Sequence, residues 1–468
     1  METKRSTFKG SIGFVLAAAG SAVGLGNIWR FPYLAANGGG GLFLVIYIVL
    51  ALTFGFTLLI SEVSLGRKTK QGPLTAYGKL SKKWGWLGAF AAIVPFMILP
   101  YYCVIGGWVM KYMFVFIFKS NGTAATDDYF SNFIGSVPQP IIFTAVFLMI
   151  TAIVISKGVN KGIENISKIL MPILLILVIF ISIFALTISN DDRSGLDGLK
   201  IYIIPSVKGM SAGDIIEVVI NAMGQLFFSI SVAMGIMVAY GSYFRDEDNL
   251  VKSVNQIEFF DTLIAFLAGV MIIPAVYVFM GREGMENSGA GLMFEAIPKV
   301  FDSMGSIGRF VGIAFFIMVF FAALTSSMSI LEAVVSSLMD KFHMSRLWAT
   351  VTETTIALVL GILVCCGSNG IIDFSIKLPD GSKADILGAF DYLSNQILMP
   401  ILAIGTCILI GWIAKPKSVI DEATRNGEKF GRKNLYVVMI KYIAPVMLLA
   451  LFVKSSGIYD LISKTLKN

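Results

Sequence analysis

The fold is decided by residues 20–32, which read Gly20-Ser21-Ala22-Val23-Gly24-Leu25-Gly26-Asn27-Ile28-Trp29-Arg30-Phe31-Pro32. This stretch interrupts an apolar segment that would otherwise form one membrane-spanning helix, and each glycine weakens a helix by about 1 kcal/mol relative to alanine. Small residues alone are also typical of close helix packing in membranes. Asn27 and Arg30 are costly in lipid, however, and irregular backbone at that depth is tolerated only in a protein interior or beside a watery cavity. We therefore interpret the stretch as a broken helix that forms a binding site.

The composition is that of a polytopic membrane protein. The chain has 468 residues, of which 56% are hydrophobic and only 14% charged, whereas soluble domains contain about 25% charged residues. No long polar segment could form a soluble domain, so we expect a single membrane domain over residues 1–468. The net charge of +7 does not indicate nucleic-acid binding, because Lys and Arg lie in alternate short loops, as the positive-inside rule predicts.

Enzyme chemistry finds no support in the sequence. The four cysteines lie in or beside apolar segments without CxxC spacing, and the single histidine, His343, lies in a short basic loop. No HExxH motif or His/Cys nucleophile arrangement is present, so neither zinc chemistry nor an intramembrane enzyme is indicated.

Eleven apolar segments reach roughly the 20 residues that a hydrocarbon core requires. They cover residues 11–35, 42–66, 86–118, 139–156, 163–187, 214–241, 255–280, 307–340, 347–365, 385–413 and 433–463. The first and sixth segments are interrupted and lie five apart, which is what two five-helix repeats of inverted topology produce. We expect repeat one at 9–187, repeat two at 211–413 and an added eleventh helix at 433–463.

Basic loops set the expected orientation. Lys and Arg concentrate before residue 11, at 67–83 and at 415–433. Because positive loops face the cytoplasm, the N-terminus is expected inside and, with an odd number of spans, the C-terminus outside. A multi-pass protein of the inner or plasma membrane is predicted.

The sixth segment contains the run Gln225-Leu226-Phe227-Phe228-Ser229-Ile230-Ser231-Val232-Ala233-Met234-Gly235. Its serines could satisfy backbone groups freed by a second break, or could simply bond to the preceding helical turn. Beside the first broken helix we favour the break, because two breaks at one depth can jointly form a site.

Both interruptions resemble motifs of the neurotransmitter:sodium symporter family, and the bacterial amino-acid transporters of that family look most similar. Residues 20–32, followed by Asn37-Gly38-Gly39-Gly40, are similar to its first-helix signature, and the run that begins at Gln225 is similar to its sixth. The resemblance extends over nearly the whole chain. It implies a leucine-transporter-like fold, with a 5+5 inverted repeat, broken helices 1 and 6, and alternating access.

The resemblance implies two Na⁺ sites, and oxygen ligands are what this hard cation requires. The first would use Ala22, Asn27, Ser229 and Asp261; the second would use Gly20, Val23, Ala322, Thr325 and Ser326. From the residues alone, Asp261 could also be a helix-end carboxylate, and Thr325-Ser326 could bond to carbonyls one turn earlier. Related transporters have Asn at the position of Asp261 and bind chloride nearby, so the fixed carboxylate predicts chloride independence.

The resemblance also implies an amino-acid pocket. Its residues would be Ala22, Val23, Gly24, Leu25, Gly26, Ile98, Tyr102, Phe228, Ser229, Ser231, Met234, Ser326 and Ile330. Tyr102 would contact the substrate carboxylate, although an interfacial aromatic residue is an equally simple reading of it. Met234 is flexible where the leucine-selective relative has a phenylalanine, which favours hydrophobic and aromatic side chains broadly. The effect of Ser21, which replaces an Asn of many bacterial relatives, is left open.

The resemblance also implies residues that open and close the two sides of the site. Arg30, Asp391 and Phe228 are similar to the outer gate, and Arg5, Asp340 and Tyr243 to the inner gate. Arg5 could equally serve topology. Glu62 could brace the break in the sixth segment or pair with Arg67, and the spacing of Gly162 and Pro172 is similar to a motif that unwinds the fifth helix.

Together these features predict a Na⁺-coupled symporter that imports hydrophobic or aromatic L-amino acids and has no covalent chemistry. A transport-inactive amino-acid sensor of the same fold is the alternative, and an ion channel is a further one. The channel lacks support because residues 20–32 do not repeat a carbonyl filter.

Overall fold

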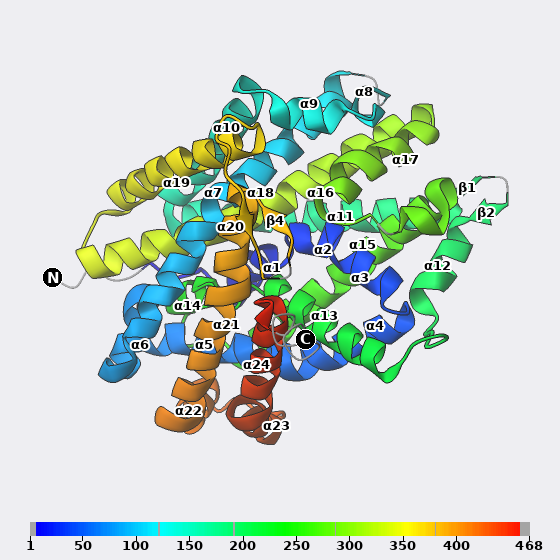
Figure 1. Ribbon diagram of the computed structural model, residues 1–468. Coiled ribbons are helices and arrows are strands. Elements are labelled where there is room, and N and C mark those ends of the chain that lie inside the picture. Colours follow the sequence, from blue (N-terminus) through cyan, green and yellow to red (C-terminus); the bar gives the residue numbers. More distant parts are fainter. Residues whose placement is uncertain (1–5, 120–121, 191, 286, 380, 459–468) are drawn as a thin grey trace, which may run out of the picture.

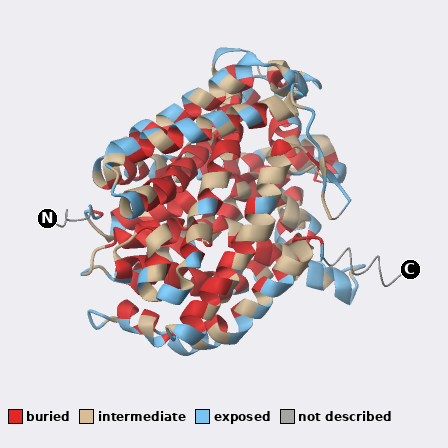
Figure 2. Cartoon of the chain, turned by 60° about the vertical axis from the view of Figure 1, so that its left-hand side comes forward, coloured by how far each residue is buried: buried red, intermediate tan, exposed pale blue. Residues whose placement is uncertain are grey.

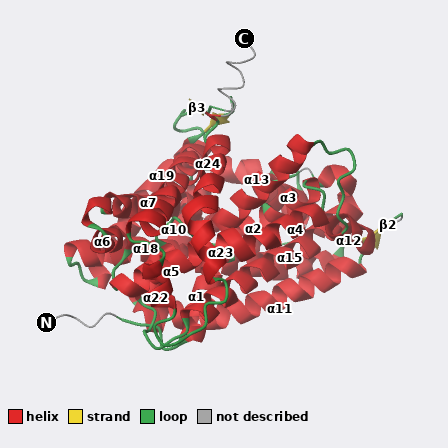
Figure 3. Cartoon of the chain, turned by 90° about the horizontal axis from the view of Figure 1, so that it is seen from below, coloured by secondary structure: helices red, strands yellow, loops and turns green. Residues whose placement is uncertain are grey.

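The computed structural model describes residues 6–119, 122–190, 192–285, 287–379 and 381–458. These ranges are almost entirely helical, and the helices cross one another around a buried centre (Figures 1 and 3). Nine helices in them are long and apolar enough to span a membrane, and α1 (Ser11–Ala22) forms a tenth span with the helical stretch Leu25–Asn37 after a bend of 53°. The interrupted pair α13 (Ala212–Ser229) and α14 (Ile236–Ser242) occupies the sixth predicted segment. The prediction of an all-α polytopic protein with broken helices 1 and 6 is confirmed.

The last predicted segment, 433–463, is shorter than expected, because its helix ends at Ser455, and residues 459–463 lie outside the described part of the chain. Apart from this end, the nine continuous spans agree with the remaining predicted segments to within a few residues. They are Gly41–Thr69 (with α4, Gly41–Leu50, and α5, Phe56–Thr69), Lys82–Phe118 (with α7, Trp86–Phe118), Pro138–Ser156 (α10), Val159–Thr187 (with α11, Asn165–Thr187), Leu250–Gly284 (α15), Ser306–Phe342 (α18), Arg346–Ser368 (α19), Ile386–Ile413 (with α20, Ile386–Asp391, and α21, Met399–Ile408) and Lys433–Ser455 (with α23, Lys433–Val438, and α24, Ala444–Ser455).

Short elements connect the spans. The connecting helices are α6 (Pro73–Leu80), α8 (Gly122–Ala125), α9 (Tyr129–Gly135), α12 (Gly195–Ile203), α16 (Gly289–Gly291), α17 (Ile297–Ser303) and α22 (Lys417–Ala423), whereas α2 (Leu25–Trp29) and α3 (Phe31–Asn37) form the second half of the first span. Two antiparallel hairpins pair β1 (Ser189–Asn190) with β2 (Arg193–Ser194) and β3 (Ile376–Lys377) with β4 (Lys383–Ala384), in the registers Ser189↔Ser194 and Ile376↔Ala384.

The seventh span begins earlier than its hydropathy indicates. The helix α15 starts at Leu250 because the Asn249 side chain accepts a hydrogen bond of 2.8 Å from the Lys252 amide, which caps the helix. Its first turns are polar, so hydropathy places the start at residue 255. As a result Asp261 lies well inside the helix, and the alternative of a helix-end carboxylate is wrong.

Both breaks have backbone that no helix can adopt. Val23 has ψ 86° and Gly24 is extended, which ends α1 before α2 begins. Between α13 and α14, Ser231, Ala233 and Gly235 have φ of 53°, 56° and 70°. Positive φ is uncommon for Ser and Ala and costs free energy unless the surroundings hold it. Buried residues fill the interior and exposed residues lie mostly on the outside (Figure 2), and Val23, Ser231 and Ala233 at the two breaks are buried.

Candidate functional site

Three buried polar side chains from three helices meet between the two breaks. The Asn27 Nδ2 donates to Asp261 Oδ1 at 2.8 Å, and the Ser229 hydroxyl lies 2.6 Å from the same oxygen and 3.1 Å from Asn27 Oδ1. Tyr47, from α4, donates to the other Asp261 oxygen at 3.4 Å. Asn27 and Asp261 are fully buried and Ser229 is 5% exposed. Asn27, Ser229 and Asp261 come from α2, α13 and α15, so the site exists only when both broken helices pack on α15.

The negative charge of this cluster belongs to the Asp261 carboxylate. In the ranges that the structure describes, Asp261 makes hydrogen bonds but no ion pair with Lys or Arg. A buried carboxylate is stable only with a compensating positive charge or after protonation. The amide, hydroxyl and carboxylate oxygens are the ligand types that a hard cation takes. The residues present therefore fit Na⁺.

The second predicted cation cluster lies where α18 faces the first break. The Ser326 hydroxyl is 3.4 Å from the Gly20 carbonyl and 3.1 Å from that of Ser21. Thr325 bonds instead to the carbonyls of Phe321 and Ala322 in its own helix, at 2.9 and 3.1 Å. Ser326 thus reaches across to the break, whereas Thr325 has the helix-bonded arrangement that isolated threonines often have.

Tyr102 lies beside the first break and not at a membrane interface. Its hydroxyl is buried, and no described residue holds it in a hydrogen bond of normal geometry. A Cβ added to Gly24 would lie 3.5 Å from this hydroxyl and 3.1 Å from Ser326 Oγ. Gly24 therefore leaves a small polar space, bounded by two hydroxyls, next to α2.

A contact between the breaks that sequence reasoning missed involves Ser21. Its hydroxyl donates to Ser231 Oγ at 3.1 Å, and Ser231 Oγ donates to the Ser21 carbonyl at 3.0 Å. Gln225 Nε2 also donates to the Gly26 carbonyl at 3.1 Å. The two interrupted helices are thus joined directly, and the positive φ of Ser231 places its side chain for this contact.

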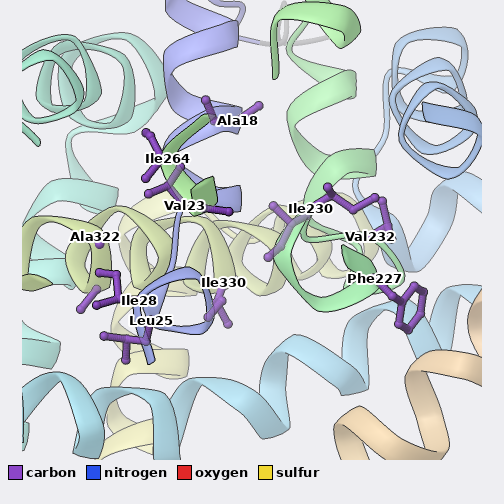
Figure 4. Close-up of a cluster of buried hydrophobic side chains, with 14 of the residues drawn as sticks. Ala18, Val23, Leu25, Ile28, Phe227, Ile230, Val232, Ile264, Ala322 and Ile330 are labelled. Atoms are coloured by element: carbon purple, nitrogen blue, oxygen red, sulfur yellow. The ribbon is translucent and has the colours of Figure 1, made fainter. Parts of the chain in front are cut away.

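Apolar side chains surround the two breaks. Figure 4 shows Val23 and Leu25 from the first break, residues beside the second break, and Ile330 from α18 in one cluster. Ile98 and Ile330 are each 4% exposed, whereas Phe228 and Met234 are partly buried. Three of the predicted pocket residues, Val23, Leu25 and Ile330, therefore lie in one apolar cluster.

Glu62 contacts the second break. Its Oε1 accepts a hydrogen bond of 2.7 Å from the Ala233 amide, at one of the residues with positive φ. The alternative partner, Arg67, pairs instead with Glu422 in α22, at 2.6 Å from Nε to Oε1. The alternative of a Glu62–Arg67 pair is therefore wrong, since Arg67 is turned toward α22.

The predicted outer pair is not joined in this structure. Among the described residues, Asp391 bonds to Asn395 Nδ2 at 2.6 Å and to the Tyr101 hydroxyl at 3.5 Å, with no ion pair to Arg30. The Arg30 guanidinium lies over the Phe228 ring, with 5.1 Å from Cζ to the ring centroid. Arg30 thus covers the aromatic side chain that was predicted to close the pocket.

At the opposite end, Arg5 lies outside the described residues. Asp340 accepts a hydrogen bond from the Gly72 amide. The Tyr243 carbonyl accepts a hydrogen bond of 3.1 Å from the Phe8 amide, which ties the segment before α1 to the end of α14.

A buried ion pair that sequence reasoning missed adjoins Tyr243. Arg346 binds Glu332 through both terminal nitrogens, at 2.6 and 2.9 Å, and Tyr243 donates to Glu332 Oε1 at 2.6 Å. We call Tyr243, Glu332 and Arg346 the inner cluster. The sequence offered one indication of this cluster, because Glu332 is a carboxylate two helical turns after Thr325 in an apolar span.

Gly162 lies in a π-helical turn before α11, and Pro172 lies inside α11. A Cβ at Gly162 would come within 2.0 Å of the Val154 carbonyl, so only glycine fits there. Widened turns of this kind often occur at functional sites.

Comparison with known proteins identifies the family. A profile of the sodium:neurotransmitter symporter family matches residues 5–132 and 127–466. The chain belongs to the sodium:neurotransmitter symporter family. It is therefore a sodium-dependent symporter and not an enzyme, and the resemblance seen in the sequence is confirmed.

Relatives of this symporter cover nearly its whole length. It is 32% identical to the uncharacterized sodium-dependent transporter YhdH of Bacillus subtilis, over 98% of this chain and 99% of that protein. An uncharacterized sodium-dependent transporter of Haemophilus influenzae is 30% identical, over 97% and 98% of the two chains. Among solved structures, the crystal structure of MhsT in complex with L-phenylalanine is similar, with a TM-score of 0.84, 32% identity and coverage of 97% of this chain and 100% of that one.

Proposed function

We propose that this symporter couples inward Na⁺ movement to the import of hydrophobic and aromatic L-amino acids, without chloride. The observation that carries the proposal is the buried Asp261 carboxylate, which joins both broken helices through Asn27 and Ser229 but has no cationic side chain as a partner in the described ranges. Na⁺ bound there would supply the missing positive charge. The same carboxylate would take the place of a bound chloride, since it already supplies the negative charge.

The substrate would bind with its charged groups at the two breaks. Tyr102 has a buried hydroxyl without a partner of normal geometry, and it faces the space beside Gly24, where a carboxylate would find a donor. The carbonyls of Ala22, Phe228 and Ser231 would accept the ammonium group. The side chain would contact the apolar residues that surround both breaks, and such walls distinguish sizes only by about 1–3 kcal/mol per methylene. The crystal structure of the relative MhsT with L-phenylalanine supports an aromatic substrate.

Transport would proceed by alternating access. The proposed repeats, 9–187 and 211–413, would move around the fixed ion and substrate sites, with the N-terminus cytoplasmic and the C-terminus outside in the inner or plasma membrane. The Arg30–Asp391 pair would form when the outer side closes over Phe228. Arg5, Asp340 and Tyr243 would close the inner side.

The test is uptake of labelled tryptophan, phenylalanine and leucine into proteoliposomes, with an inward Na⁺ gradient or an equal K⁺ gradient. We expect accumulation above equilibrium only with Na⁺, unchanged when gluconate replaces chloride. Na⁺-dependent binding without accumulation would instead identify a sensor, and unitary currents a channel. Loss of uptake in gluconate would refute chloride independence alone.

A further inference from the structure

Glu353 is a membrane-buried carboxyl that the transport mechanism does not use. It lies in α19 and is 1% exposed. The buried residues of α19 form one stripe of otherwise small or apolar character, with this carboxyl and two threonines as the exceptions: Ala349, Thr350, Glu353, Thr354, Ala357, Gly361, Val364 and Cys365. The stripe faces α7, α10 and α18, so the carboxyl points into protein and not into lipid.

No partner stabilises a negative charge at this position. Among the residues that the structure describes, neither a hydrogen bond nor an ion pair is made by Glu353, and its Oε1 is buried. The hydroxyl of the adjacent Thr354 is likewise buried without a partner. An ionised carboxylate without partners is costly inside a protein and more so within a membrane. In this conformation the carboxyl is therefore neutral and carries a proton.

The titratable groups around Glu353 lie on the helices that pack against α19. The Cys103 thiol, on α7, is close enough to Glu353 for the two to interact electrostatically, and α10 contains no titratable side chain. On the other elements packed against α19, Glu332 pairs with Arg346, Asp391 accepts from Asn395 and Tyr101, and Asp340 accepts from the Gly72 amide. Lys111 donates to Gln139, Arg309 to the Ile117 carbonyl and Tyr112 to the Phe294 carbonyl. Tyr102 lies beside Gly24, the Tyr129 ring packs against that of Tyr112, and Lys341 is exposed near the end of α18.

The inner cluster lies at the end of the same stripe. Arg346 begins α19 seven residues before Glu353, which is two helical turns or about 10 Å. Arg346 holds Glu332 of α18 and lies 3.4 Å from the hydroxyl of Tyr243, at the end of α14. If α14 moves away when the inner side opens, the inner cluster separates and water can enter along α19 toward Glu353.

We propose that Glu353 is a proton-binding site of this symporter, filled while the inner side is closed and emptied when water enters along α19. A proton held by only one of two conformations favours that conformation as the pH falls. Acid therefore favours the closed inner side, and the ratio of closed to open molecules changes by up to about tenfold per pH unit.

The amide of Phe8 reports the closed state, because it donates to the Tyr243 carbonyl at 3.1 Å. We would measure its hydrogen–deuterium exchange by mass spectrometry, in the full chain in liposomes with K⁺ and no substrate, between pH 6 and 8. After correction for the intrinsic pH dependence of exchange, protection is expected to fall as the pH rises, by up to about tenfold per unit. Glu353→Gln, which cannot release a proton, should remove this slope.

The matched control is Glu217→Gln, an exposed carboxylate in α13 that should keep the wild-type slope. If the glutamine variant fails to fold, Glu353→Met, which is similar in length and uncharged, should also remove the pH slope. A wild-type slope retained in the Glu353 variants, or protection that does not change with pH in the wild type, would overturn the proposal. Neither result depends on the substrate or on the proposed direction of transport.

Discussion

Replacing Glu62 by alanine tests whether the break in helix 6 depends on one hydrogen bond. Glu62 is 2% exposed, and its Oε1 accepts from the Ala233 amide at 2.7 Å. Ala233 has a φ of 56°, which a non-glycine residue adopts only when its surroundings hold it. Without the carboxyl, this amide is left buried and without an acceptor, which costs about 1–3 kcal/mol. If the cost falls on the binding conformation, the affinity for substrate drops by about 5- to 150-fold.

The assay is equilibrium binding of labelled phenylalanine to purified protein in saturating Na⁺. Glu62→Ala should raise Kd by the amount just given, whereas Glu62→Gln, which keeps an acceptor oxygen, should raise it by less than about fivefold. Glu217→Ala is the matched control, because that side chain is 56% exposed and its contact with Lys454 spans 3.9 Å. Exposed pairs contribute only about 0–1 kcal/mol. An unchanged Kd in Glu62→Ala, or equal losses in the two Glu62 variants, would refute the reasoning.

Three further substitutions test the site and its support. Gly24→Ala places a Cβ 3.1 Å from Ser326 Oγ, and overpacking of this kind costs about 1–3 kcal/mol, so phenylalanine binding should weaken by about tenfold or more. Asp261→Asn removes the charge proposed to hold Na⁺, and the Na⁺ concentration for half-maximal binding should rise at least about tenfold, or about 1.4 kcal/mol. Arg67→Met leaves Glu422 buried without its main partner, a loss of about 3–5 kcal/mol, which should lower the melting temperature in detergent.

Each of these has a control in the same chain. Gly135→Ala should leave binding unchanged, because nothing lies within 4 Å of the added Cβ. Asp197→Asn and Lys200→Met alter an exposed pair, with side chains 44% and 66% exposed, and should change neither Na⁺ dependence nor melting temperature measurably. Wild-type binding in Gly24→Ala, wild-type Na⁺ dependence in Asp261→Asn or an unchanged melting temperature in Arg67→Met would contradict the corresponding argument.

Local sequence chemistry was sufficient to predict the first break, and the second was predicted only in combination with the first. Glycine weakens a helix and Asn27 and Arg30 are costly in lipid, whereas Ser229 and Ser231 alone could equally bond to the preceding helical turn. Hydropathy predicted the spans because a membrane-spanning helix requires roughly 20 consecutive apolar residues. It failed at the start of α15, where a side-chain cap on Asn249 extends the helix into polar residues.

Contacts between distant segments could not be predicted in this way. Arg67 and Glu422 are separated by 355 positions, and no periodicity links them. Arg346 looked like one more basic loop residue, although its guanidinium turns inward to Glu332. The family resemblance, rather than residue patterns, brought Asp261 together with Asn27. Which partner a buried charge chooses depends on side-chain packing that only the assembled helices determine.

The two breaks and the buried carboxylate require one another. Against unbroken helices, α15 could bury Asp261 only with a compensating positive charge or a bound proton, and none of the described Lys or Arg side chains pairs with it. Breaking helices 1 and 6 brings an amide and a hydroxyl to the carboxylate instead, but these neutral groups leave its charge in place. In the proposed mechanism Na⁺ therefore neutralises the charge and also holds α2 and α13 together. Sodium dependence would then arise from the stability of the closed site, because without the cation the same contacts surround an uncompensated charge.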